Sequence, residues 1–226
     1  MALGWQLWLS PRPLRRTDTP LGPRMLSPND AALYEFFYND EGHLIVRETH
    51  YAENQVVRDG LSGPPLHIHL RQTEFFQVEQ GTLAVTKNGK EYVLTKDDGI
   101  LKISPGTRHR FWAHSSTQED LIFKVWAEPQ EFEHAFDENY LRNALGYLRN
   151  CQEENIKPSI FQMALLGWSS DTIFVTPPFW VPIWILRLIQ YMIGCVVGQI
   201  LLGYRVTYPE YNIKPREDTR VLKKQK

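Results

Sequence analysis

The chain has 226 residues, of which 42% are hydrophobic and 23% charged, and its formal net charge is −1. This length allows one medium domain with extensions or two small domains, and the composition is ordinary for a globular protein. The overall charge gives no reason to expect a nucleic-acid partner. Its two cysteines, Cys151 and Cys195, are too few for a disulfide framework or a zinc finger, which favours a reducing compartment.

The N-terminal segment is basic and irregular. Residues 1–28 hold four arginines, several prolines and a single acid, Asp18. The opening MALGWQLWL is apolar but short, and its positive charges follow the apolar run, so it is a poor secretory signal. Its arginine content fits a transit peptide only in part. We expect instead a loose N-terminal arm over residues 1–40 that packs one or two tryptophans on the domain.

The middle of the chain, residues 41–129, has the pattern of an all-β domain. Short runs rich in Val, Ile, Thr and aromatic residues alternate with turn residues. Asn88-Gly89 is a strong hairpin signal, because a type I′ turn needs positive φ at both central residues. The runs predict an antiparallel sandwich or barrel with strands at residues 43–51, 65–70, 74–80, 82–87, 91–95, 100–104, 108–114 and 120–127.

Alternation along these strands places several polar side chains on the inward face. His67 and His69 are two residues apart and therefore share a face. Glu74 shares its face with two apolar residues of its own strand. His109 lies opposite two arginines, which belong in water, so it too faces inward. Four polar groups are thus predicted inside one small barrel.

Two interpretations of these four groups follow from the residues alone. Each group could be a separate core residue that hydrogen bonds satisfy, as a lone inward histidine usually is. Burying three imidazoles and a carboxylate together is costly unless they are paired or bind a cation. This donor set suits a divalent first-row metal such as iron, manganese, nickel, copper or zinc. We favour the metal site.

The spacing of these residues resembles the first motif of the cupin family. In that motif, His-x-His precedes a Glu by three or four residues, and a Gly follows six residues later. Here His67, His69, Glu74 and Gly81 match this spacing. The glycine that opens the motif is imperfect, because Gly60 lies one residue too far from the histidines.

The second cupin motif is matched in part. It runs Gly, five residues, Pro-x-Gly, two residues, His, three residues and Asn. The matching residues here are Gly99, Pro105, Gly106 and His109. Pro105 and Gly106 are adjacent, without an intervening residue, and Ala113 replaces the final Asn. These departures fall on turn residues and on a residue that binds no metal.

The resemblance covers about residues 43–127 and implies a mainly β fold. That fold is the cupin double-stranded β-helix, a jelly-roll barrel, followed here by C-terminal helices. Carried over residue by residue, the resemblance makes His67, His69, Glu74 and His109 the ligands of one divalent transition metal, with iron first and manganese, nickel, copper or zinc as alternatives. Such a set leaves coordination positions open, as a catalytic centre requires.

The pocket beside this centre is expected to be apolar and aromatic. Its predicted lining consists of Phe76, Val78, Tyr92, Phe111 and Phe123. Such a wall suits a small aromatic or polyketide-like molecule better than a sugar or a phosphate. The sequence shows no obvious second acid–base pair.

Residues 130–170 are predicted to be a helical extension. Within it, residues 131–150 carry apolar side chains at helical spacing, and Asp137 is a plausible N-cap. We expect this helix to pack on the outside of the barrel.

The following segment is apolar and long enough to cross a bilayer. Residues 179–203 contain a single charge, that of Arg187. Three interpretations stay open. The helix could span a membrane, or lie in its interface with Arg187 and Gln190 facing water. It could also pack on the barrel or on a second subunit through the small pair Gly194 and Gly198.

The boundaries of this predicted apolar helix are residues 171–204, and a basic tail follows over residues 205–226. The positive-inside rule would keep that tail in the cytosol and place the barrel across the membrane, yet no signal peptide explains such export. We therefore expect an intracellular protein, cytoplasmic or associated with a membrane through residues 179–203. A homodimer is a further expectation, because dimers are common for this fold.

Two classes of function fit the sequence. The first is a mononuclear metal-dependent enzyme that acts on a small organic substrate. The resemblance favours an oxidoreductase of dioxygenase type in secondary metabolism, with isomerisation, dehydration or decarboxylation as the alternative. The second is a non-catalytic, ligand-binding cupin that its C-terminal helix anchors. The complete ligand set favours the enzyme, although one fold hosts many functions.

Overall fold

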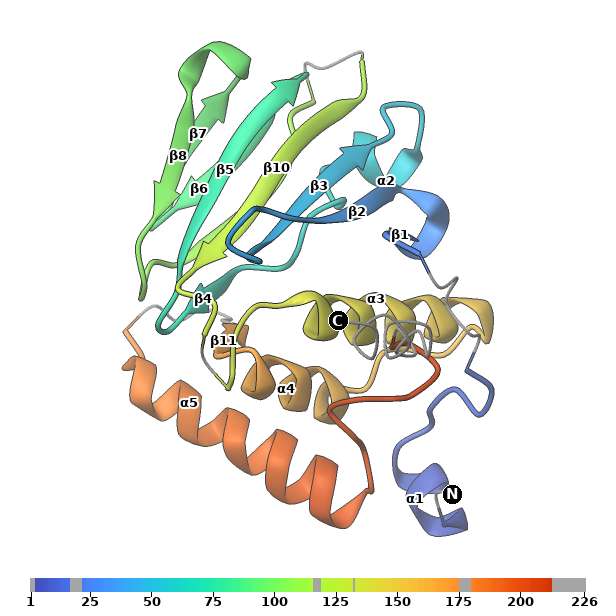
Figure 1. Ribbon diagram of the computed structural model, residues 1–226. Coiled ribbons are helices and arrows are strands. Elements are labelled where there is room, and N and C mark those ends of the chain that lie inside the picture. The colour runs from blue at the N-terminus through green and yellow to red at the C-terminus, as the bar shows by residue number, and fades with distance from the viewer. Residues whose placement is uncertain (1–2, 17–21, 116–118, 132, 175–179, 213–226) are drawn as a thin grey trace, which may run out of the picture.

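The computed structural model describes residues 3–16, 22–115, 119–131, 133–174 and 180–212 (Figure 1). Two antiparallel sheets face one another, with strand orders β1-β2-β3-β10-β5-β8 and β11-β4-β9-β6-β7. The strands are β1 Arg24–Leu26, β2 Ala32–Tyr38, β3 Leu44–His50, β4 His67–His69, β5 Thr73–Gln80, β6 Leu83–Lys87, β7 Lys90–Leu94, β8 Ile100–Ile103, β9 His109–Ala113, β10 Leu121–Glu128 and β11 Thr172–Phe174. The predicted double-sheet fold with C-terminal helices is confirmed.

All eight predicted strands are present, from β3 to β10. Asn88 and Gly89 connect β6 to β7 with φ values of 49° and 82°, as a type I′ turn requires. The core between the sheets contains side chains from strands of both, and Phe76, Phe111 and Phe123 contact one another there. The alternation therefore identified the inward faces correctly.

The predicted N-terminal arm over residues 1–40 is wrong in two respects. First, β1 and β2 lie within it, and β2 pairs with β3 so that Phe36 is buried in the main core. Second, the tryptophans of helix α1 (Gly4–Leu9) are not packed, because Trp5 is 49% exposed and Trp8 80% exposed. Polar contacts attach this segment instead, since the Gln6 amide donates to the Leu201 carbonyl.

Helix α3 (Glu138–Glu153) closes the lower end of the sheets in Figure 1. The predicted N-cap is confirmed, because Asp137 accepts a hydrogen bond of 2.7 Å from the backbone N–H of Tyr140. The helix begins later than predicted. Its placement on the outside of the barrel is also wrong, because Leu141 and Leu145 belong to the main core.

The remaining helices form a layer below α3. They are α4 (Ile160–Ser169), α5 (Ile183–Tyr191) and the π-helical η3 (Met192–Leu201), with the short helices α2 (Gln55–Arg58), η1 (Pro28–Asp30) and η2 (Lys96–Asp98) elsewhere. The predicted helix over residues 171–204 is wrong at its start, because residues 172–174 form β11. This strand adds to the barrel by pairing with β4. Residues 175–179, and the basic tail from residue 213, lie outside the described residues.

The α5–η3 segment turns its polar side toward the protein. Gln190 is buried and donates to the carbonyls of Thr172 and Ala164, and Arg187 forms an ion pair with Asp171. The interpretation that placed Arg187 and Gln190 in water is therefore wrong. Ile183–Leu201 is long and apolar enough to cross a membrane by length and composition alone, which is weak evidence. Membrane association and a homodimer remain predictions.

The glycine pair of this segment contacts α4 closely. A Cβ at Gly194 would lie 2.6 Å from the backbone N of Leu165, and one at Gly198 would lie 3.0 Å from the carbonyl oxygen of Phe161. Backbone atoms cannot move aside as a flexible side chain can. The close approach that small residues permit is therefore made within this chain.

We predict that Gly194→Ala destabilises the protein by about 1–3 kcal/mol, because the added methyl group overpacks the contact with α4. Urea denaturation of the full-length variant measures this change. Gly4→Ala is the matched control, because no atom lies within 4 Å of a Cβ there and helix propensity favours alanine. Equal stability of the wild type and Gly194→Ala would mean that α5–η3 does not pack on α4 in solution.

Candidate metal centre

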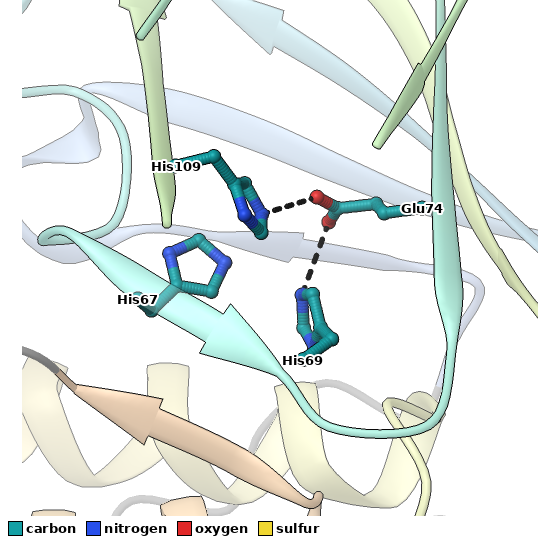
Figure 2. A group of neighbouring side chains, drawn as sticks. All are labelled: His67, His69, Glu74 and His109. Carbon is teal, nitrogen blue, oxygen red and sulfur yellow. Dashed lines mark hydrogen bonds and ion pairs between the residues drawn. The ribbon is translucent and has the colours of Figure 1, made fainter. Parts of the chain in front are cut away.

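Four predicted residues come together from three strands at the lower end of the barrel (Figure 2). His67 and His69 lie on β4, Glu74 on β5 and His109 on β9. One nitrogen or oxygen atom of each lies within 4.8 Å of the others. All four side chains are at most 4% exposed. The strand pairing explains the convergence, since His67 is directly opposite His109.

The outer nitrogen of each histidine has a fixed partner. His67 Nδ1 lies 2.9 Å from the Pro65 carbonyl oxygen, and His109 Nδ1 lies 2.9 Å from that of Thr107. A carbonyl only accepts, so both Nδ1 atoms donate. The Thr172 hydroxyl donates to the Ser170 carbonyl and lies 3.1 Å from the third Nδ1, that of His69.

These contacts decide the tautomers of the three imidazoles. In the neutral form of each ring the proton is on Nδ1, and the lone pair of Nε2 points toward the centre of the cluster. Histidines that bind a metal are held in this way, with the other ring nitrogen donating to a carbonyl, a carboxylate or a hydroxyl. Two backbone carbonyls and the Thr172 hydroxyl therefore prepare the three rings as ligands.

Glu74 supplies the negative charge of the cluster. Burial by itself raises the pKa of its carboxyl, but the charge of His69 and the hydrogen bond from His109 outweigh it and lower the pKa overall. Glu74 Oε2 lies 2.8 Å from His109 Nε2. Burial disfavours the charged form of His109, yet that contact with Glu74 raises its pKa above the ordinary value. In this arrangement a proton lies where a metal would bind.

The residues present fit a divalent metal ion. His69 Nε2 is buried and has no hydrogen-bond partner, and its closest carboxylate oxygen, from Glu74, is 3.6 Å away. An unpaired buried nitrogen is costly, and a cation would satisfy it. Three imidazole nitrogens and one carboxylate are the donors that first-row transition metals prefer. The pKa of His67 is well below its usual value because of burial and the neighbouring histidines, so its nitrogen is free of a proton at neutral pH.

A cavity of about 270 Å³ adjoins the cluster. His67, His69 and Glu74 line it, whereas His109 is not part of its wall. The rest of the wall is mostly apolar and aromatic, and it is built by both sheets and by α3, α4 and the loop before β4. Lining residues include Phe111, Val125, Phe136, Tyr140, Leu141, Leu145, Met163 and Phe174. One side of the cluster thus faces a concave space that suits a small molecule.

Only one of the five predicted pocket residues lines the cavity. Phe111 lines the cavity. Phe76, Val78 and Phe123 are buried in the main core but are not part of the cavity wall. Tyr92 is 36% exposed on β7, and the prediction that it lines the pocket is wrong. The physical reason is that β7 is the edge strand of its sheet, so no further strand covers the ring.

Several residues of the cavity wall were missed in the sequence. Tyr34 lies in the segment predicted as an arm, and Tyr140 on the helix predicted to lie outside the barrel. Glu48 could have been found, because it shares the inward parity of β3 with His50 and with two buried apolar residues. Thr172 gave no signal, because a strand of three residues is too short to show a period.

Comparison with known proteins identifies the family. A model of the cupin domain matches residues 54–125. The probable oxidoreductase virH of Hypocrea virens is 53% identical over 215 residues, which are 95% of this chain and 97% of that protein. The chain belongs to the cupin family. The oxidoreductase iacF of Pestalotiopsis fici is 48% identical to this cupin over 204 residues, which are 89% of this chain and 100% of that protein.

A more distant relative carries a more specific name. The epoxidase atD of Aspergillus terreus is 31% identical to this cupin over 152 residues. The matched region is 66% of this chain but 47% of that protein. The likeness therefore concerns only about half of the larger relative.

We predict that purified full-length protein carries about one transition metal per chain and that the double variant His67→Ala/His109→Ala carries none, because half of the donor set is removed. Elemental analysis of both proteins measures this. His43→Ala is the control, since this histidine lies near Glu41 and Glu131, away from the cluster. Metal content that is unchanged in the folded double variant would contradict the site.

Acid should release the metal, because the ion must displace the proton between Glu74 and His109. A raised pKa of His109 means that this proton is held more tightly than on a free imidazole. Metal affinity is therefore expected to fall as pH falls, by about tenfold per pH unit for each proton displaced. Competition with a chelator at pH values between 8 and 5.5 gives the slope, and an affinity that does not change with pH would argue against ligation by His109.

Proposed function

We propose that this protein is an intracellular metal-dependent oxidoreductase that oxidises a small aromatic or polyketide-like molecule. His67, His69, Glu74 and His109 would hold the metal, with iron as the first choice and manganese, nickel, copper or zinc as alternatives. The observation that carries the proposal is the convergence of three prepared imidazole nitrogens and a carboxylate beside a mostly apolar cavity, whose wall includes three of these four residues. A metal site that a small molecule can reach from a cavity is suited to catalysis rather than to structural support.

When it is bound, such a metal supplies Lewis acidity and, if it is iron or copper, redox chemistry with dioxygen. The chain's own residues supply the surroundings. His67, His69 and Glu74 present their donor atoms to the cavity, and the aromatic rings of Phe111 and Phe136 offer flat apolar contacts. The cavity is slightly smaller than the pockets that hold drug-sized ligands, which favours a substrate with one or two rings.

The relatives support the oxidative choice. Two proteins that align with most of this chain are named as oxidoreductases, and a third, more distant one is named as an epoxidase. We extend the first description to this chain as a proposal, because the alignments cover nearly the whole of both partners. A dioxygenase-type tailoring step in secondary metabolism is the specific reaction that we propose.

We expect Glu74→Gln to lower turnover by about 100-fold or more, because an amide is a poorer donor to the metal and lacks the negative charge. The full-length protein is loaded with Fe(II), Cu(II), Mn(II), Ni(II) or Zn(II) and mixed with a panel of phenols, hydroquinones and enols. Oxygen uptake and the product mass are measured.

The matched control is Glu35→Gln, since Glu35 is a buried carboxylate that forms ion pairs with Arg24 and Arg47 outside the cavity. Turnover should persist in this variant. Equal oxygen uptake by the wild type and by Glu74→Gln would refute the proposal. Turnover without oxygen uptake, supported by zinc, would replace oxidation with isomerisation, dehydration or decarboxylation.

A further inference from the structure

A second carboxyl group lies in the wall of the same cavity. Glu48 is 2% exposed and belongs to β3, where it is directly opposite Tyr34 of β2 and Phe123 of β10. It lines the cavity together with Glu74 but is not part of the metal cluster. A buried carboxyl group costs free energy unless something uses or satisfies it.

The partners of Glu48 form a short chain of polar groups. Glu48 Oε2 lies 2.9 Å from His50 Nε2, and His50 Nδ1 lies 2.8 Å from Ser62 Oγ. The Tyr34 hydroxyl also forms a hydrogen bond with the carboxyl group. His50 is fully buried and its ring meets Phe123 edge-on, so its orientation is fixed. Glu48 is therefore positioned firmly by a histidine whose own orientation is fixed.

The cavity offers Glu48 no cation. None of the described residues that line it is lysine or arginine. Burial raises the pKa of Glu48, and the hydrogen bond and charge of His50 only partly offset this. An ionised Glu48 is thus a stronger base than an ordinary surface carboxylate. The absence of arginine and lysine from the described wall also argues against a carboxylate or phosphate ligand.

The strand register sets the spacing between the two carboxyl groups. Strand β10 lies between β3 and β5. Its residue Ala127 is opposite Glu74 of β5, and its residue Phe123 is opposite Glu48 of β3. The Cα atoms of Glu48 and Glu74 are therefore about 13 Å apart along the strand direction, at roughly 3.3 Å per residue. Their side chains point into one cavity, so a one- or two-ring molecule at the metal cluster extends toward Glu48.

We propose that Glu48 is a second catalytic residue of this cavity, which binds a phenolic or enolic hydroxyl of the substrate and accepts its proton. This inference rests on the proposed function for the identity of the reaction but not for the binding itself. His50 and Ser62 are positioning residues, because they touch Glu48 and each other rather than the reacting atoms.

The proton balance of this step is simple. The substrate O–H bond breaks, its electron pair stays on the substrate oxygen, and the proton moves to the Glu48 carboxylate. His50 Nε2 keeps donating its hydrogen bond to Oε2 of that carboxyl group and so holds its orientation, while the substrate's proton resides on Glu48. When the oxyanion is protonated again, Glu48 returns the proton, and no oxidant or reductant is consumed.

A purely structural role is the competing explanation, in which Glu48 only satisfies His50 and Tyr34. The two roles differ in pH dependence. If Glu48 accepts the proton, binding of a phenol requires its ionised form and weakens as pH falls through its pKa. If Glu48 has only a structural role, its substitution changes the stability of the protein but not the pH dependence of phenol binding. The other titratable groups that line the cavity are Tyr34 of β2, Glu74 of β5, His67 and His69 of β4 and Tyr140 of α3, and His50 of β3 contacts Glu48 without being part of the wall.

The test uses 4-nitrophenol as a probe, because its absorption separates the bound phenol from the bound phenolate. Affinity for the full-length protein is measured from pH 4.5 to pH 6.5, where the probe is mainly the neutral phenol, without metal and with Zn(II), for the wild type, Glu48→Gln and Glu35→Gln. At pH 6.5, where most of the free probe is still the neutral phenol, we expect about tenfold weaker binding by Glu48→Gln, as for the loss of a hydrogen bond to a charged group. The wild type and Glu35→Gln should agree.

The decisive quantity is the dissociation constant of Glu48→Gln divided by that of the wild type. Both proteins keep the cluster, so its titration is common to both and cancels in the ratio. The ratio should shrink toward one as pH falls, because protonation of Glu48 removes the acceptor for the phenol O–H. A ratio independent of pH, the same loss in Glu35→Gln, or no binding of the probe by the wild type would each overturn the proposal.

A second variant keeps the test decisive if Glu48→Gln does not fold. The hydrogen bond from Tyr34 lowers the pKa of Glu48, so Tyr34→Phe should move the binding profile to higher pH. An unmoved profile in Tyr34→Phe would count against the proposal. Metal content is measured in the same samples. If the purified wild type binds no metal, the proposed function is refuted. If the metal content is normal but the ratio of dissociation constants does not change with pH, only the role of Glu48 is refuted.

Discussion

The structure depends on the burial of three imidazoles and one carboxylate in a small barrel. Each histidine meets this cost in the same way, because its outer nitrogen donates to a carbonyl or a hydroxyl and its inner nitrogen turns toward the others. The carbonyls of Pro65 and Thr107 come from turns at the ends of β4 and β9. The turns and the strand register thus fix the tautomers together, and a cation at the centre would complete the arrangement.

The C-terminal helices support this centre rather than merely covering it. The hydroxyl beside His69 belongs to Thr172, and the carbonyl of Thr172 accepts a hydrogen bond of 2.8 Å from Gln190 on α5. Arg187 of the same helix pairs with Asp171, next to Thr172. The two polar residues that interrupt the apolar segment therefore hold β11 in place. Its apolar residues remain on the outer side, and Trp184 and Leu188 are among those exposed.

The cavity has two different polar regions in one apolar wall. At one, the cluster presents lone pairs that suit a cation. At the other, Glu48 presents a carboxyl group that His50 orients. The described lining between them is largely aromatic and aliphatic and carries no lysine or arginine. A neutral ring compound with hydroxyl groups is the ligand that we propose for these surroundings, because its hydroxyl groups can bond to the few polar groups of an otherwise apolar wall.

The sequence alone determined the strands from β3 to β10, the inward faces of His67, His69, Glu74 and His109, and the N-cap of α3. These features are encoded locally, in periods of two residues, in turn residues and in spacing. The tertiary structure decided that β2 and β11 join the barrel, that α3 closes the cavity, and that the apolar helix turns its polar side inward. Each of these depends on partners far away in the chain. Short strands and helix faces carry no record of which distant surface they meet, and packing energy makes that choice.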